Sequence, residues 1–318
     1  MTALEPFALA ATRAAALACQ HQVGRGDGKK ADAAATEAMR AELSAAPGTG
    51  TVVIGEGEKD DAPMLFNGEQ VGDGQGPRFE IAVDPLECTT LCAKGLPGSL
   101  ATIAFAADGA MADLGPAFYM DKLVGSPALA AAGLEIGEPP EANLERAAAA
   151  LGKPVSELCV VVLDKPRHEE LISRIHAAGA RVVTPSDGDV AGALEALLER
   201  GGADLLMGIG GTPEGVMTAC AVRAVGGFMQ GRLAPQLPEE GRAVAKAGLS
   251  ADRVYGLDDL IHDESFFVAT GITGGPLLRS PWVEGGRLHT ESILIGTGTV
   301  RRVIQLEAEN QPDREERA

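Results

Sequence analysis

Two acidic residues close to the end of an apolar run are the strongest candidates for chemistry in this sequence. Asp84 and Glu87 occur in the segment Asp84-Pro85-Leu86-Glu87-Cys88-Thr89, directly after the predicted strand Phe79–Val83. Carboxylates that converge on one point repel each other unless they are protonated or bridged by cations, and oxygen ligands of this kind suit Mg²⁺ or Mn²⁺. The alternative is a helix start whose acidic residues complement the helix dipole.

Two further acidic segments favour the metal site. Glu56 follows the predicted strand Thr51–Ile54 and lies between two glycines, which leave room for a ligand beside the carboxylate. Asp32 lies one loop earlier, and on its own it would be interpreted as a surface residue of a helix. Taken together, three acid-bearing elements in the first 90 residues predict a site for two or more divalent ions.

The second half of the chain carries groups that suit a phosphorylated sugar. Lys165 and Arg167 follow a predicted strand, at the edge where α/β sheets bind ligands, and arginine can bind two phosphate oxygens at once. At the next junction, Asp187-Gly188-Asp189 either accepts hydrogen bonds from sugar hydroxyls or caps a helix. The third junction is Gly208–Glu214, where capping alone explains the acidic residue, so Glu214 is not assigned to a metal on local grounds.

The composition argues against several other classes of protein. The chain has 318 residues and a formal net charge of −18 with no block of Lys or Arg, so nucleic acid is not an expected partner. The five histidines have no metal-ligand spacing, and no G-x-S-x-G sequence occurs. Neither a zinc site nor a serine hydrolase is therefore indicated.

Several features favour a cytoplasmic location. The first residues lack the basic start and the cleavage site of a signal peptide, and no apolar run approaches the roughly 18 residues of a membrane span. The five cysteines are odd in number and form no C-x-x-C pair, which is typical of a reduced compartment. We expect no membrane partner.

The apolar pattern predicts a mixed α/β protein. Strands alternate with helices in the second half, which indicates β-α units on a parallel sheet. A stretch rich in Gly, Pro and Ala between Gly125 and Glu141 reads as a linker, and 318 residues correspond to about two domains. We therefore expect an N-terminal metal-binding domain over 1–135 and a C-terminal substrate-binding domain over 136–318. The predicted strands are Thr51–Ile54, Phe79–Val83, Ser99–Ala107, Leu158–Leu163, Arg181–Thr184, Ala203–Met207, Phe266–Ala269 and Ser292–Ile295, and the predicted helices are Glu5–Val23, Lys30–Leu43, His168–Ala178, Val190–Leu198 and Glu214–Val225.

These motifs, in their order along the chain, resemble the class II fructose-1,6-bisphosphatases of the GlpX type, within the lithium-sensitive sugar and inositol phosphatase superfamily. The resemblance covers nearly the whole chain. The segment Leu91–Gly95 with Gly98-Ser99 is most similar to the bifunctional fructose/sedoheptulose bisphosphatases of photosynthetic bacteria. The matching motifs are Gly24-Arg25-Gly26-Asp27, Ile54–Glu58, Asp60 with Ala62–Leu65, Asp84–Glu87, Tyr119-Met120, Lys165–His168, Asp187–Val190, Gly208–Gly211 with Pro213–Gly215, and Ala269–Thr273.

The resemblance implies a layered α/β/α/β/α fold and a set of site residues. It implies that cations activate water, neutralise the phosphate and stabilise the leaving alkoxide, with Thr89 and Asp60 as catalytic residues acting on that water. Lys165 and Arg167 would hold the distal phosphate. The implied metal ligands are Asp32, Glu56, Asp84, Glu87 and Glu214, and the implied substrate contacts are Glu87, Cys88, Thr89, Tyr119, Lys165, Pro166, Arg167, Asp187, Gly188, Asp189 and Gly211.

Cys88 departs from the pattern of this family, which has glycine at the corresponding position. If the backbone there has a positive φ, a side chain costs about 1 kcal/mol or more. A second departure is Gly28-Lys29-Lys30, where the family commonly has Lys-Asn directly after Asp27, so the helper lysine is not identified.

The expected function is metal-dependent hydrolysis of the 1-phosphate of D-fructose 1,6-bisphosphate, with sedoheptulose 1,7-bisphosphate as a further substrate of interest. The expected assembly is a homo-oligomer, either a dimer or a tetramer. One alternative is an inositol-type monophosphatase, which needs no paired cations for a distal phosphate. The other is a phosphosugar-binding protein that is catalytically weakened by Cys88.

Overall fold

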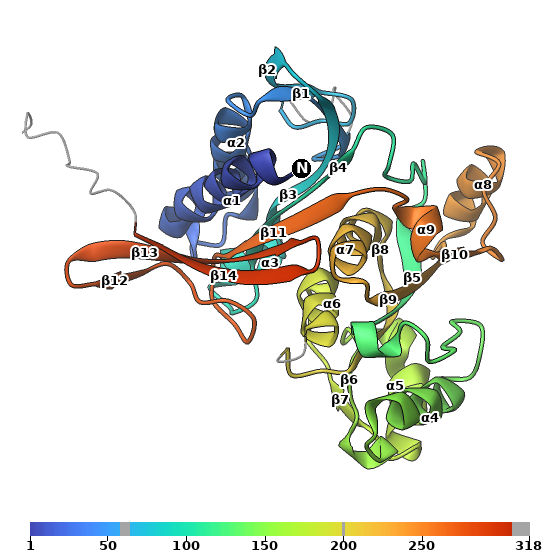
Figure 1. The fold of residues 1–318 in the computed structure, drawn as a ribbon. Helices are drawn as coiled ribbons and strands as arrows, with labels where there is room; N and C mark the ends of the chain where they lie inside the picture. The colour runs from blue at the N-terminus through green and yellow to red at the C-terminus, as the bar shows by residue number, and fades with distance from the viewer. Residues whose placement is uncertain (58–63, 199–200, 307–318) are drawn as a thin grey trace, which may run out of the picture.

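The computed structural model describes residues 1–57, 64–198 and 201–306. Its elements form two β-sheets and three layers of helices (Figure 1). The expected catalytic residue Asp60 lies outside the described residues, so the structure does not place it.

The first sheet is eight-stranded and mixed, and it draws on both ends of the chain. Only the pair β1 and β3 is parallel, whereas the other neighbours are antiparallel. In spatial order it contains β12 (Trp282–Glu284), β13 (Arg287–Gly296), β11 (Ser265–Gly271), β4 (Leu100–Ala107), β3 (Arg78–Glu87), β1 (Gly48–Ile54) and β2 (Gln70–Gln75), with β14 (Thr299–Leu306) paired to β13.

The second sheet is six-stranded. The expected parallel arrangement is confirmed for β6, β7 and β8, the strands that alternate with helices in the sequence. The other half of the sheet is antiparallel, which the pattern did not predict. In spatial order the sheet contains β10 (Val254–Gly256), β9 (Phe228–Leu233), β5 (Tyr119–Gly125), β8 (Leu205–Gly211), β6 (Cys159–Val161) and β7 (Arg181–Val183).

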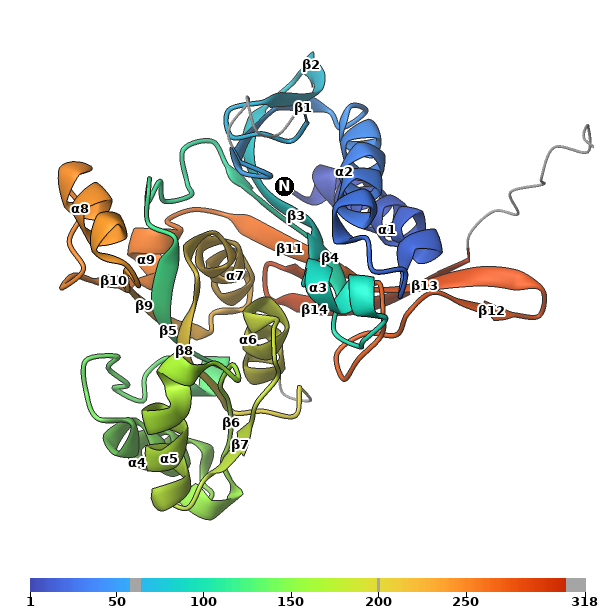
Figure 2. The same ribbon diagram turned by 180° about the vertical axis from the view of Figure 1, so that it is seen from behind.

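Helices cover both sheets and separate them (Figures 1 and 2). The outer layer on the first sheet is α1 (Glu5–Cys19) and α2 (Gly28–Leu43), the central layer is α6 (Asp189–Leu197) and α7 (Thr212–Val225), and the outer layer on the second sheet is α4 (Pro140–Leu151) and α5 (Glu169–Ala177). Short helices α3 (Thr89–Lys94), α8 (Pro238–Lys246) and α9 (Leu257–Leu260) lie at the edges. The α/β/α/β/α layering implied by the resemblance is confirmed.

Three clusters of buried apolar side chains fill the spaces between these layers, one around the central helices and one beneath each outer pair of helices. On β3, Ile81 and Val83 face α1 and α2, while Ala82 faces the central helices. This alternation follows from the two-residue period of a strand. Small residues on the inner face let α7 pack closely, and burial of both faces accounts for the continuous apolar runs in the sequence.

The sheets do not follow the expected division at residues 135 and 136. Strands β11 to β14 return from the second half to complete the first sheet, and β5 from the first half belongs to the second sheet. The domain boundary itself stays a prediction. The linker expectation agrees with an irregular connection between β5 and α4 that contains only one short 3-10 helix, Pro127–Leu129.

Candidate active site

A cleft of about 610 Å³ brings together most of the predicted residues. It lies where the end of β3 meets the loops at the edge of the second sheet, and it receives groups from both halves of the chain. Among the predicted residues, its walls contain Asp84, Glu87, Cys88, Thr89, Tyr119, Lys165, Arg167, Asp187, Asp189, Gly211 and Glu214. Pro166 and Gly188 do not line it, but each lies between two residues that do. The predicted metal ligands Asp32 and Glu56 are not among its wall residues either.

A β-bulge in β3 places both acids of the leading motif in this cleft. Residues three apart on a regular strand point to opposite faces. Here the register with β4 shifts between Asp84 and Glu87, which pair with Thr102 and Leu100. The extra residue turns both carboxylates toward the same side. The predicted position of Pro85, in a turn or at a helix start, is wrong, because it lies in this bulge, where proline's missing N–H is tolerated.

Asp84, Glu87 and Glu214 form a compact group, with one carboxylate oxygen from each within 4.8 Å of the other two. Burial and then neighbouring charges raise the pKa of Glu87 well above its usual range, chiefly through Asp84, and a hydrogen bond joins the two carboxyl groups. Burial, followed by the charge of Asp189, raises the pKa of Glu214 to about 7. Without cations this group therefore retains protons.

Asp32 and Glu56 extend the same electrostatic cluster. Burial raises the pKa of Asp32 to about 6, with the charge of Asp84 as the second cause. Burial raises the pKa of Glu56 to about 8, followed by the charges of Asp32 and Asp84. All five predicted metal ligands thus lie within one field of mutually repelling carboxylates, although they come from α2, from the loop after β1, from β3 and from α7.

The residues present fit divalent cations. The donor atoms of the cluster are carboxylate oxygens, which Mg²⁺ and Mn²⁺ prefer. One of them, Glu214 Oε2, is buried and has no hydrogen-bond partner among the described residues. A buried carboxylate oxygen left in this state is costly, and a cation would satisfy it.

Cys88 connects the bulge to helix α3. Its backbone has φ 64° and ψ 52°, a left-handed conformation that carries a cost for any residue with a side chain. The condition considered for this position, a positive φ, is therefore met. Its Sγ lies 3.7 Å from Glu87 Oε1, and burial followed by the charge of Glu87 raises the pKa of the thiol. The neighbouring Thr89 hydroxyl donates to the Leu86 carbonyl at 3.1 Å, at the edge of the acid group.

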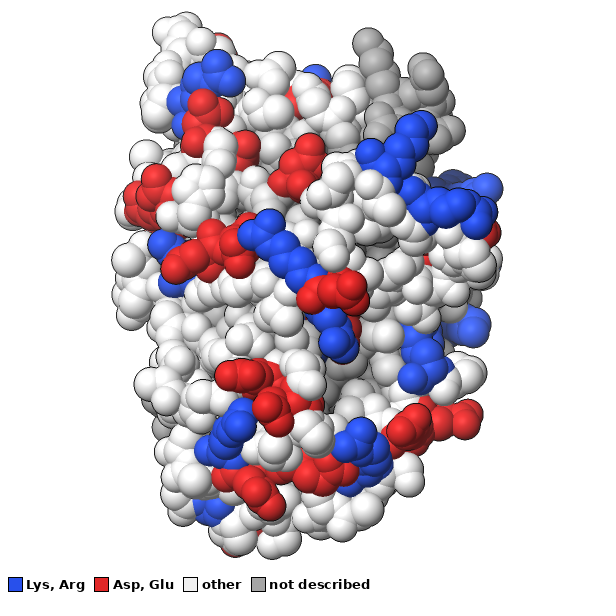
Figure 3. All heavy atoms as spheres, turned by 90° about the vertical axis from the view of Figure 1, so that its right-hand side faces the viewer, with Lys and Arg blue, Asp and Glu red and all other residues white. Residues whose placement is uncertain are grey.

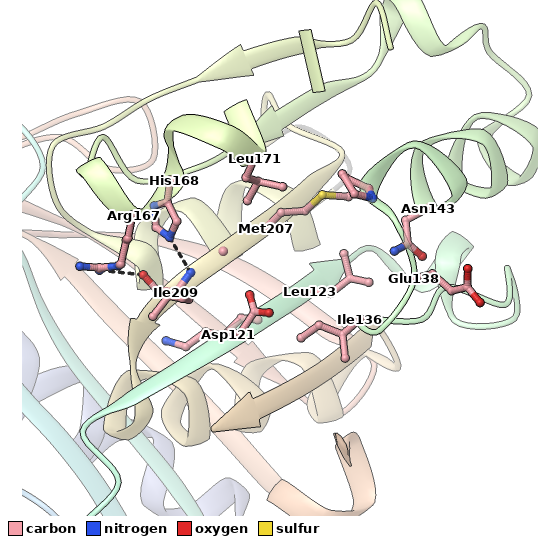
Figure 4. Close-up of a pocket in the computed structure, with 13 residues that line it drawn as sticks. Asp121, Leu123, Ile136, Glu138, Asn143, Arg167, His168, Leu171, Met207 and Ile209 are labelled. Atoms are coloured by element: carbon pink, nitrogen blue, oxygen red, sulfur yellow. Dashed lines mark hydrogen bonds between the residues drawn. The ribbon is translucent and has the colours of Figure 1, made fainter. Parts of the chain in front are cut away.

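The basic end of the cleft is held by the backbone of the second sheet. Arg167 Nη2 donates to the Ile209 carbonyl at 2.8 Å, and its guanidinium lies 5.3 Å from the centre of the Tyr119 ring. The adjacent His168 is buried, and both of its ring nitrogens have partners. Ile209 N donates to its Nε2 at 2.8 Å (Figure 4), and its Nδ1 contacts the Leu163 carbonyl at 2.8 Å. His168 thus orients the segment that carries Arg167.

A smaller cavity of about 250 Å³ lies behind this segment, and Arg167 borders both spaces (Figure 4). Its walls are largely apolar, with Leu123, Ile136 and Met207 among them. The Asn143 side chain on its rim already bonds to the backbone of Glu135 through both its oxygen and its nitrogen.

Glycines shape the wall of the cleft near α6 and α7. Gly188 has φ 95° and precedes α6, so it allows the sharp turn that places Asp189 at the start of the helix. A Cβ at Gly211 would lie 1.7 Å from Glu214 Oε2, so only glycine leaves this carboxylate its present position. These contacts explain why Gly188 and Gly211 occur next to functional residues without contributing side chains.

One charged residue of the site was missed by sequence reasoning. Lys122 of β5 is 2% exposed and forms an ion pair with Asp189. The only signal in the sequence was a lysine preceding an apolar pair in Met120-Asp121-Lys122-Leu123-Val124. Such a pattern does not reveal the partner, because the acid is supplied by a helix 67 residues further along the chain.

The surface agrees with the acidic composition. On the face shown in Figure 3, acidic and basic side chains are interspersed, and the described residues of that face form no continuous basic band. Within the described part of the chain, the helices are too short or too polar to cross a membrane.

Comparison with known proteins places these features in one family. The profile of the family described as "Bacterial fructose-1,6-bisphosphatase, glpX-encoded" matches residues 3–307. The chain is 43% identical to the protein named "Fructose-1,6-bisphosphatase class 2" of Haemophilus influenzae, over 92% of each chain. It is 41% identical to "Fructose-1,6-bisphosphatase 1 class 2" of Escherichia coli K12, over 96% of this chain and 95% of the relative. The chain belongs to the family of bacterial, glpX-encoded fructose-1,6-bisphosphatases.

Proposed function

We propose that this protein hydrolyses the 1-phosphate of D-fructose 1,6-bisphosphate, in a metal-dependent reaction that releases fructose 6-phosphate and phosphate. The observation that carries the proposal is a single cleft whose walls contain both clustered carboxylates, here called its acidic end, and the cations Lys165 and Arg167, here called its basic end. One phosphate of a bisphosphate substrate would react beside the carboxylates, and the other would be bound by Lys165 and Arg167. The names of the two relatives support the same substrate.

The proposed metal ligands are Asp32, Glu56, Asp84, Glu87 and Glu214, and they would hold two or more Mg²⁺ or Mn²⁺ ions. When bound, such ions neutralise phosphate charge, activate water and stabilise the departing oxygen. The protein's own contribution is to keep these acids fixed and close, so that they do not have to assemble during the reaction. A covalent nucleophile is not needed.

The remaining residues bind and orient the substrate. Lys165 and Arg167 bind the 6-phosphate, with Pro166 fixing the turn between them and Tyr119 supporting the guanidinium. Asp187 and Asp189 accept hydrogen bonds from sugar hydroxyls, and the backbone at Cys88, Gly188 and Gly211 allows close approach. Thr89 orients the attacking water, and Asp60 assists as base or orienting acid.

A phosphate-release assay tests the proposal. The purified protein is assayed with fructose 1,6-bisphosphate, fructose 1-phosphate and inositol 1-phosphate, each with Mg²⁺, Mn²⁺ or EDTA. Turnover of the bisphosphate that is lost in EDTA supports the proposal, and ³¹P NMR identifies the phosphate removed. Equal turnover of inositol 1-phosphate would instead indicate an inositol-type monophosphatase, and binding without turnover would indicate a phosphosugar-binding protein.

Sedoheptulose 1,7-bisphosphate is proposed as a second substrate, which would connect the protein to the Calvin cycle. The support is the resemblance of Leu91–Gly95 to the bifunctional enzymes, since this segment includes the end of α3, whose first residue Thr89 lines the cleft. The same assay with this sugar gives the answer directly. A kcat/KM more than about a thousandfold below that for the fructose substrate, equivalent to about 4 kcal/mol, would refute the second activity.

We further propose a cytoplasmic homo-oligomer, a dimer or a tetramer. All five cysteines lie among the described residues and are free thiols, as expected in a reduced compartment. Exposed apolar side chains gather on the last strands, including Val283, Val300 and Ile304, and such a row favours association. Light scattering during gel filtration measures the assembly, and a monomer at all concentrations would refute it.

A further inference from the structure

A buried lysine lies beneath the acidic end of the cleft. Lys122 is 2% exposed, and its Nζ pairs with Asp189 Oδ2. Asp189 lines the cleft, whereas the cleft walls do not include Lys122. Burying an ammonium costs several kcal/mol unless a partner compensates it, so the Asp189 carboxylate is needed to offset the burial of Lys122.

The backbone approaches this ion pair closely at two glycines. A Cβ at Gly210 would lie 1.9 Å from Asp189 Oδ2, so the carboxylate occupies the space that a side chain would fill. A Cβ at Gly215 would lie 3.1 Å from Lys122 Cε and 3.6 Å from its Nζ. The pair is therefore enclosed by β8 on one side and by the first turn of α7 on the other.

This enclosure brings Lys122 close to a second acid of the cleft. Gly215 directly follows Glu214 in α7, and the lysine charge lowers the pKa of Glu214 in opposition to burial and Asp189. Lys165 and Arg167 form the basic end of the cleft. Lys122 instead supplies positive charge beneath the acidic end, where it pairs with Asp189. The ammonium group of Lys122 therefore has two acidic neighbours, Asp189 and Glu214, for which different roles are proposed.

We propose that Lys122 is a positioning residue, which fixes the Asp189 carboxylate for a sugar hydroxyl and tempers the attraction of the acid cluster for cations. This inference rests on the proposed function, because it assumes that a sugar bisphosphate occupies the cleft. Since Lys122 acts from below, its effect on the substrate passes through Asp189. Its effect on the cations is a direct charge effect.

Lys122→Met separates these effects from a purely structural one. The variant keeps an unbranched side chain that is one atom shorter and removes its charge. We expect the KM for fructose 1,6-bisphosphate to rise about tenfold, equivalent to about 1.4 kcal/mol, with kcat within threefold of the wild type. We expect the Kd for Mn²⁺, measured by electron paramagnetic resonance without substrate, to be lower, because a repelling charge has been removed.

Lys153→Met is the matched control. Lys153 Nζ pairs with Asp204 Oδ1 at 2.5 Å, in a partly buried ion pair whose residues do not line the cleft. This control is expected to lower the melting temperature while leaving KM and the Mn²⁺ Kd unchanged. A parallel rise of KM and Mn²⁺ Kd in Lys122→Met, or an unchanged KM, would overturn the inference.

A double variant keeps the inference testable if Lys122→Met fails to fold. Lys122→Met with Asp189→Asn removes both buried charges, which folded proteins often tolerate. If Lys122 acts through Asp189, this double variant and Asp189→Asn alone have the same KM within twofold. A substantially higher KM in the double variant would contradict the inference. Failure of the proposed function is distinct, since the wild-type protein would then release no phosphate from the bisphosphate.

Discussion

The acidic and basic ends of the cleft differ in whether their charged groups have partners within the protein. At the acidic end, the carboxyl groups of Asp84, Glu87 and Glu214 come together, with Asp32 and Glu56 in the same electrostatic field. Their pKa values are raised, chiefly by burial, and one oxygen of Glu214 has no hydrogen-bond partner among the described residues. At the basic end, Lys165 is half-buried and Arg167 is exposed, and the guanidinium is already bonded to the sheet backbone. The acidic end is incomplete without cations, whereas the Arg167 guanidinium at the basic end already has a hydrogen-bond partner.

This difference predicts how the two ends divide the work. The carboxylates of the acidic end are held close together although they repel one another. This part of the cleft is therefore arranged in advance to stabilise charge that develops during the reaction. Groups that are satisfied in the free protein, and that lie at the surface, can bind a phosphate with little rearrangement. Changes at the acidic end should therefore reduce kcat, and changes at the basic end should mainly raise KM.

The largest expected effect comes from Asp84→Ala. Asp84 belongs to the three-carboxylate group and contributes to the raised pKa of Glu87, Asp32 and Glu56. Its loss removes a cation ligand, so we expect kcat to fall by about a thousandfold or more, equivalent to about 4 kcal/mol. Steady-state phosphate release measures it. Asp108→Ala, which removes an exposed ion pair with Arg78, is the control, and a normal rate in Asp84→Ala would break the comparison.

Arg167→Ala tests the basic end. Charge-assisted hydrogen bonds contribute about 1.5 to 3 kcal/mol, so we expect the KM for the bisphosphate to rise roughly tenfold to hundredfold. The value of kcat should change less than threefold. Arg146→Ala is a matched control, because Arg146 also donates to a backbone carbonyl, that of Gly133, at 2.8 Å and does not line the cleft. A large loss of kcat with an unchanged KM would reverse the assignment of the two ends.

Removal of the metal should make the stability of the acidic end depend on pH. The pKa values of Asp32, Glu214 and Glu56 are raised to about 6, 7 and 8. Raised pKa values give a contribution to stability that is present below the usual pKa of a carboxyl group and is lost as pH rises through these values. In EDTA, we therefore expect the melting temperature to fall between about pH 5 and pH 8.5.

Glu56→Gln isolates this effect. The amide does not titrate, so the variant should lose about 1 to 2 kcal/mol less than the wild type over the same interval, since each pKa unit corresponds to about 1.4 kcal/mol and partial exposure reduces the effect. Mn²⁺ should flatten the wild-type curve, because it displaces the protons. Identical slopes for both proteins in EDTA would show that the acidic end is not electrostatically strained.

The two ends also differ in how far the sequence predicts them. The acid-bearing motifs and the basic pair were recognisable because strand ends bring such residues to one edge, and the family resemblance supplied Glu214, which capping alone would explain. The bulge at Pro85 was not predictable, because local patterning does not encode the register with β4. Lys122 was missed for a related reason, since its partner Asp189 approaches only through packing of α6 on β5.

The same limit applies to the fold. Long, buried runs such as β4 and β11 were predicted, because apolar residues on both faces leave few alternatives. The antiparallel partner β5 was missed, as its sequence Tyr119–Gly125 mixes charged and apolar residues and follows a glycine-rich and proline-rich loop. The return of β11 to β14 to the first sheet is a long-range pairing that no local signal specifies.

The smallest predicted effect is that of Cys88→Gly, at the point where the acidic end meets α3. Glycine adopts φ 64° without the steric cost of a Cβ, so we expect the free energy of unfolding to rise by about 1 kcal/mol. Chemical denaturation with EDTA present measures this without any contribution from bound cations. Glycine also removes the thiol that lies 3.7 Å from Glu87 Oε1, which should leave kcat equal to or higher than that of the wild type.

Cys159→Ala is the control, because Cys159 lies in β6, away from the cleft, and loss of its buried side chain should destabilise the fold. If Cys88→Gly were less stable and less active than the wild type, the Cys88 side chain would be a working part of the acidic end, and the strain at this residue would be offset by what its sulfur contributes there.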